Sequence, residues 1–225
     1  MRRSNLTPTG FTLVELTIVI VVIGLLLGTI VWGQELVRSS RTKAVIIQLN
    51  ELSAAVTAYR DRYRQIPGDD TGAQARWGWT AVPAAVPSSP GNGVVDGAYN
   101  ALTAVPEPES RLFWWHLRQA GFLAGPIDPA NTALAAAQPV NTVGGMMGVT
   151  TGAGAATVGL TGLIVCTANL PAKIASAVDI RVDDGTSAAG AVRAQRQTGP
   201  NENLGIAASA YVEDGGDYLL CRKLE

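Results

Sequence analysis

Residues that build catalytic centres are scarce in this 225-residue chain. It contains one histidine and two cysteines, so a four-cysteine zinc site is excluded, and a zinc hydrolase or a Cys–His enzyme has almost nothing to work with. Only 16% of the residues are charged, and the formal net charge is −1, which gives no indication of a basic nucleic-acid-binding body. We therefore expect no enzyme, and protein partners rather than nucleic acid.

Apolar residues, in contrast, are concentrated near the N-terminus. A 22-residue run from Phe11 to Trp32 carries a single charge, that of Glu15. At 1.5 Å per residue such a helix spans roughly 33 Å, enough to cross a hydrocarbon core of about 30 Å. Residues 11–32 are therefore predicted to form a transmembrane helix in a lipid bilayer.

The polar stretch before this helix is short. It reads MRRSNLTPTG and ends at Gly10, and the apolar run begins at once with Phe11. An ordinary secretory signal has its apolar region before the cleavage site. A cut after Gly10 would do the reverse, because it would keep the helix and remove residues 1–10 as a leader.

Residues 10–15, GFTLVE, resemble the signature of the type IV prepilin family, in which a short basic leader ends in Gly before Phe-Thr-Leu-Val-Glu and an apolar helix. The resemblance is strongest over roughly the first 60 residues. It implies that prepilin peptidase cuts between Gly10 and Phe11 and methylates the new amine of Phe11. Weaker likeness to a group of pilin-like proteins is carried by Tyr63 to Asp69, Trp114 to Gly121 and Asp183 to Gly185.

The resemblance also implies a location and partners. The N-terminus would lie in the cytoplasm and the body in the periplasm, anchored by one span of the inner membrane. An inner-membrane assembly platform would then build the chain into a filament together with other pilin subunits, of the same or a different kind. The filament would be either a type IV pilus, which can reach the cell surface, or a type II secretion pseudopilus. Trp32 stands where many major pilins have a helix-kinking proline, so the choice between major pilin, minor pilin and pseudopilin stays open.

Glu15 is the one charge in the predicted membrane helix. A carboxylate at the centre of such a helix costs about 2.5 to 3.5 kcal/mol, and it usually marks a functional pairing. The nearest cation would be the Phe11 amine freed by cleavage, either in the same chain or on a neighbouring subunit. Pairing between subunits would make Glu15 an assembly residue. The alternative is a side chain that merely reaches the headgroups.

The helix is predicted to continue beyond the membrane. Apolar side chains recur every three or four residues from Val45 to Tyr63, and Pro67–Gly68 ends the pattern. One helix from about Thr12 to Arg64 follows, in which residues 33–65 are amphipathic. The arginines at its end, Arg60, Arg62 and Arg64, are interpreted as a solvated face and not as a DNA site.

Residues 66–225 are predicted to form the globular body. The fold class is α+β, pilin-like, with the long N-terminal helix packed on a small antiparallel sheet. A helix is expected at residues 108–120 and a second at 171–179, with strands at 160–166, 191–195 and 217–224. Residues 131–162 are rich in Ala, Gly and Thr and are expected to be irregular or to form small-residue strands.

Cys166 and Cys221 each fall in a predicted strand. Because the resemblance places the body on the oxidising side of the membrane, we favour a disulfide between them. Two buried free thiols are the alternative.

Few other side chains suggest chemistry. The loop from Gly91 to Gly97 offers Asn92 and Asp96 as weak calcium ligands, but it lacks the EF-hand pattern, and a tight turn without a cofactor is favoured. Asp183 and Asp184 are interpreted as part of a helix-ending turn, and His116 as a packed or hydrogen-bonded core residue.

A second class of function fits the membrane helix. A single-pass, membrane-anchored binding or receptor protein would need the apolar run from Phe11 to Trp32 but neither Gly10 nor Glu15. A filament subunit needs both residues, and for this reason it is the favoured function.

Overall fold

The computed structural model describes residues 10–78, 90–102, 107–128, 132–205 and 207–224. Of the predicted leader, only Gly10 falls within these ranges. The chain forms two compact units, Met1–Ser40 and Arg41–Glu225.

Helix α1 (Leu13–Tyr63) is continuous, close to the predicted bounds. In its second half the predicted apolar stripe is buried from Val45 to Tyr59 and packs into the main core of the second unit, with Tyr63 partly buried beside it. The helix ends because Arg64 takes a left-handed conformation, with φ of 57°, and Pro67 follows soon after.

Four strands form one sheet in the order β1-β2-β4-β3. They are β1 (Met147–Thr150), β2 (Ile164–Pro171), β3 (Val192–Arg196) and β4 (Asp217–Lys223). Every neighbouring pair is antiparallel. The predicted α+β class with an antiparallel sheet is confirmed, whereas the likeness to pilins stays a prediction.

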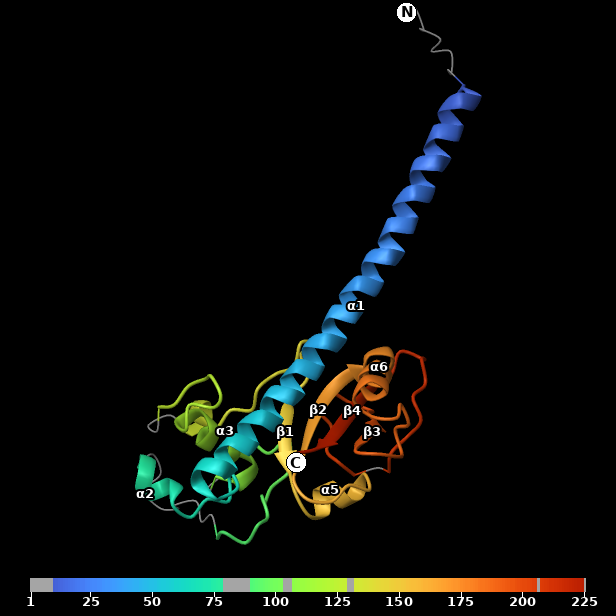
Figure 1. The fold of residues 1–225 in the computed structure, drawn as a ribbon. Coiled ribbons are helices and arrows are strands. Elements are labelled where there is room, and N and C mark those ends of the chain that lie inside the picture. Colours follow the sequence, from blue (N-terminus) through green and yellow to red (C-terminus); the bar gives the residue numbers. More distant parts are fainter. Residues whose placement is uncertain (1–9, 79–89, 103–106, 129–131, 206, 225) are drawn as a thin grey trace, which may run out of the picture. The chain divides into compact units, whose positions relative to one another are not determined.

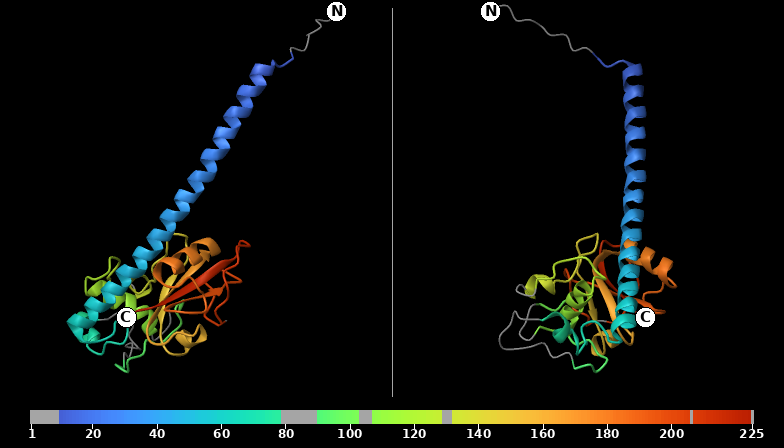
Figure 2. Two further views of the ribbon diagram at one scale, coloured as in Figure 1. Left: turned by 45° about the vertical axis from the view of Figure 1, so that its right-hand side comes forward. Right: turned by 60° about the vertical axis from the view of Figure 1, so that its left-hand side comes forward.

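The sheet is covered on both faces, because its alternating side chains enter two different cores. In β2, Val165 joins the core that contains the buried α1 residues, whereas Ile164 and Cys166 belong to a second core together with Tyr99. Figure 1 shows the second half of α1 on the β1 side of the sheet, where its buried side chains share the main core with strand residues. Helices α5 (Ala153–Thr157) and α6 (Ala172–Val182) lie toward opposite ends of the strands, and Figure 2 shows the same arrangement from two other sides.

The remaining helices are α3 (Glu109–Gln119), which matches the predicted segment 108–120, and two short ones, α2 (Ala73–Trp77) and α4 (Thr132–Ala135). They meet in a third, smaller apolar cluster, which contains Leu112 and Trp115 of α3, Ala135 of α4 and Trp77 of α2. The predicted helix at 171–179 runs on to Val182. The predicted strand at 160–166 begins only at Ile164, because Gly162 has a φ of 79° that an extended strand does not accommodate.

Candidate functional site: the N-terminal segment of helix α1

Thr12 caps the N-terminus of α1. Its hydroxyl oxygen accepts a hydrogen bond from the backbone N–H of Glu15 at 3.2 Å, and its carbonyl oxygen accepts one from the N–H of Leu16, also at 3.2 Å. Thr-x-x-Glu is the sequence pattern of a helix capping box, and a carboxylate in the first turn is favoured by the helix dipole. The pattern is contiguous in the sequence, but a reading of residues 10–15 as a processing motif does not reveal this capping role.

The predicted cleavage bond lies immediately before this cap. Gly10 and Phe11 are both outside the helix and exposed. Phe11 has 84% of its surface exposed, and no atom outside its chain neighbours lies within 4 Å of a Cβ built on Gly10. Within the described part of the chain, the Gly10–Phe11 bond is thus exposed and lies just before a capped helix.

Glu15 is exposed in the first turn of α1. Within the described part of the chain it makes no ion pair. Its predicted partner, the free amine of Phe11, is a product of cleavage, so the pairing remains a prediction.

The helix that follows has an apolar surface all around. From Phe11 to Val37, eighteen large apolar side chains are each at least 48% exposed. This part of α1 is long and apolar enough to cross a membrane, and no residue of its most apolar 18-residue stretch is buried. The helix passes through Trp32 without a break. The first unit therefore presents an apolar helix to its surroundings.

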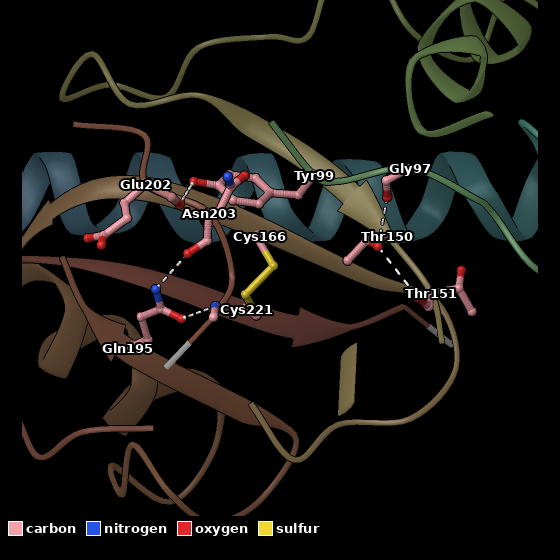
Figure 3. The surroundings of a disulfide bond; sticks show 10 residues. Gly97, Tyr99, Thr150, Thr151, Cys166, Gln195, Glu202, Asn203 and Cys221 are labelled. Atoms are coloured by element: carbon pink, nitrogen blue, oxygen red, sulfur yellow. Dashed lines mark hydrogen bonds between the residues drawn. A yellow bond between two sulfur atoms is a disulfide. The ribbon is translucent and has the colours of Figure 1, made fainter. Parts of the chain in front are cut away.

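The two cysteines are joined in a disulfide, as predicted, and close a sequence separation of 55 residues. Cys166 in β2 and Cys221 in β4 are directly opposite in the register, and both are fully buried. Figure 3 shows the bond between the two strands, with Tyr99 and Gln195 nearby. The side-chain amide of Gln195 donates to the carbonyl oxygen of Asn203 at 2.8 Å, which ties a following loop to β3.

The loop with the calcium candidates is held by hydrogen bonds within itself and to a neighbouring acidic side chain. The side-chain oxygen of Asn92 accepts from the N–H of Val94 at 2.8 Å, and the N–H of Asp96 donates to the Glu109 carboxylate at 2.8 Å. Gly91 and Gly93 have positive φ. These contacts support the interpretation as a tight turn.

A group of three carboxylates, from Asp179, Asp183 and Asp184, could hold a cation by geometry. Each already accepts hydrogen bonds of the turn. Asp179 accepts from the hydroxyl of Tyr211 at 2.7 Å, and Asp183 from the N–H of Val192 at 2.9 Å. Burial is the main cause that raises the pKa of Asp179. The negative charges of the two neighbouring aspartates raise it further, and the hydrogen bonds of Asp179 lower it.

His116 is a core residue, as predicted. It is 2% exposed, its Nδ1 accepts the N–H of Gly68 at 2.9 Å, and its ring is parallel to that of Tyr59 within 7°. Burial lowers its pKa to about 3, so the imidazole is neutral at physiological pH.

No protein-family model, curated protein or solved structure matches this chain.

Proposed function

We propose that this chain is a structural subunit of a filament, of the type IV pilus or type II secretion pseudopilus class. In this proposal, prepilin peptidase removes residues 1–10 and methylates Phe11, and the mature chain polymerises through the first half of α1. The role is assembly and not catalysis.

The observation that carries the proposal is the uncovered apolar helix. Burial of one large apolar side chain contributes about 1.5 to 3 kcal/mol, and α1 exposes such side chains along its whole first half. An apolar surface of this extent requires a cover. Before assembly the inner membrane supplies it, and in a filament the same helices of neighbouring subunits replace the lipid.

Gly10 and Glu15 favour a filament over a simple anchor. A receptor held by one helix needs no cleavable bond ahead of the helix, and a carboxylate in the first turn would there serve only the helix end. In a filament both are used, because cleavage exposes the Phe11 amine and Glu15 neutralises that charge on a neighbour in a dry helix bundle, where an unpaired ion is costly.

N-terminal mass spectrometry of the chain purified from cells with active prepilin peptidase tests the processing step. The mature chain is expected to begin at methylated Phe11. The matched control is Gly10→Leu, which places a bulky side chain next to the bond and is expected to retain residues 1–10. Wild-type protein that keeps residues 1–10 in such cells would contradict the proposal and favour the anchored receptor.

A further inference from the structure

The loop from Gly91 to Gly97 contains a chemically labile dipeptide. Asn92–Gly93 is the one Asn-Gly pair in the sequence, and Asn92 is exposed. In such a pair the backbone nitrogen of Gly can bond to the side-chain carbonyl carbon of Asn, because Gly has no Cβ to hinder the approach. The bond from that carbon to Nδ2 then breaks, and Nδ2 leaves as ammonia with the Gly proton. Water opens the resulting succinimide ring to aspartate or isoaspartate.

The geometry of the turn explains why this dipeptide is present. Gly91 and Gly93 have φ values of 67° and 81°, in the region that residues with a Cβ rarely adopt. Between them, the side-chain oxygen of Asn92 accepts the N–H of Val94 at 2.8 Å, a local bond that favours Asn in turns. The next residue, Val95, is 1% exposed and belongs to the main core. The labile pair is therefore part of what brings the loop to the core.

Asp69 holds the nitrogen that would attack. Its Oδ2 accepts the N–H of Gly93 at 2.6 Å, and its Oδ1 accepts the N–H of Gly91 at the same distance. Asp69 lies in the turn after α1 and is only 2% exposed. One buried carboxylate thus fixes both glycines that flank Asn92.

Two effects of this carboxylate oppose ring closure. The Gly93 nitrogen must lose its proton to attack, and a carboxylate at hydrogen-bond distance disfavours a second negative charge on that nitrogen. The succinimide nitrogen has no proton to donate, so ring closure would also leave one oxygen of the buried Asp69 without its donor, which is costly for a charged group. Both effects require the folded chain, because Asp69 and Gly93 are 24 residues apart in sequence.

We propose that Asp69 protects the Asn92–Gly93 pair against deamidation. The carboxylate keeps the Gly93 nitrogen protonated and engaged as a donor, and so preserves the turn that places Val95 in the core. Deamidation would add a negative charge at residue 92 and release Gly93 from Asp69. This protection does not depend on processing or polymerisation of the chain.

Peptide mapping by mass spectrometry tests the protection, on the full chain in detergent after long incubation in mildly alkaline buffer. The measured quantity is the rate at which residue 92 alone converts to succinimide, aspartate or isoaspartate. Denatured wild type is expected to convert at least about tenfold faster than folded wild type, the effect of one lost charge-assisted hydrogen bond. Asp69→Asn keeps the side-chain size but removes the charge and one acceptor oxygen. It is expected to show a similar acceleration, with an unchanged circular dichroism spectrum.

Glu109→Gln is the matched control for a loosened loop. The Glu109 carboxylate accepts a different N–H of the same loop, that of Asp96, at 2.8 Å, and Gln keeps an acceptor oxygen at this position. This variant leaves the bonds of Asp69 in place and is expected to convert within about twofold of the wild-type rate. Equal rates in folded and denatured wild type, or equal acceleration in Asp69→Asn and Glu109→Gln, would overturn the proposal.

Discussion

At the scale of single residues, the most informative side chains are those whose surroundings fix their role. His116 is enclosed by aromatic rings, with Tyr59 stacked on it and Trp77 and Trp115 at ring-centroid distances of 6.0 and 5.4 Å. With its Nδ1 on the Gly68 N–H, it joins α3 to the chain that follows α1. A lone histidine in this setting is a packing residue, which leaves the N-terminal motif as the candidate functional site.

The lowered pKa of His116 predicts an acid-sensitive fold. Because the histidine binds a proton more readily in the unfolded chain, with a pKa of 6.5, than in the folded one, with a pKa of about 3, its contribution to stability is lost as the pH falls through this window. The free energy of unfolding should fall by up to about 1.4 kcal/mol per pH unit from this group. Chemical denaturation of the full chain in detergent at pH 7 and pH 5 measures it.

His116→Gln is the matched control, because Gln cannot titrate. Glu109 acts in the opposite direction: burial raises its pKa to about 7, so its contribution to stability decreases as the pH rises. The comparison of the two chains isolates the histidine, and the wild type should lose more stability between pH 7 and pH 5 than the variant. Equal losses in both would show that His116 does not titrate in this range.

At the scale of secondary structure, the sequence predicts long or strongly patterned elements and misses short ones. Helix α1 and strand β4 lie within one residue of their predicted bounds. Strand β1 gave no alternating pattern, because all four of its residues are buried with both faces of the sheet covered. Helices α2 and α5 have five residues each, too few for a helical period to show.

The candidate functional residues also differ in how well the sequence predicts them. Gly10, Phe11 and Glu15 are visible because the motif is contiguous in sequence. The anchoring of the Gly91–Gly97 loop was not visible, since Asp69, which accepts the N–H groups of Gly91 and Gly93, precedes them by 22 and 24 residues. Sites formed by distant segments depend on tertiary packing that local patterns do not encode.

The disulfide joins two central strands of the sheet, so its loss should weaken the whole second unit. For a closed loop of 55 residues, chain entropy alone predicts a loss of about 4 kcal/mol in the free energy of unfolding. Cys166→Ala/Cys221→Ala, compared with the oxidised wild type by chemical denaturation, measures this loss. Reduced wild type should resemble the double variant. An unchanged denaturation midpoint in both would contradict a stabilising role for the bond.

At the scale of the whole molecule, the chain combines an apolar helix that needs a cover with a disulfide-bonded α+β unit. Glu15 is the one charge between Phe11 and Trp32, a segment of helix that is otherwise suited to lipid or to a bundle of identical helices. If that charge serves assembly, its removal should impair polymerisation and leave membrane insertion, processing and the second unit intact.

The most direct measurement is the amount of this chain in sheared, sedimented filaments, compared between wild type and Glu15→Gln at equal expression. We predict that the wild type is recovered in filaments visible by electron microscopy. The variant should be processed and membrane-inserted, with its disulfide formed, but should be largely absent from the filament fraction. Recovery of Glu15→Gln in filaments at the wild-type level would contradict assembly through Glu15, and a wild type found only as single membrane-anchored chains would contradict the filament itself.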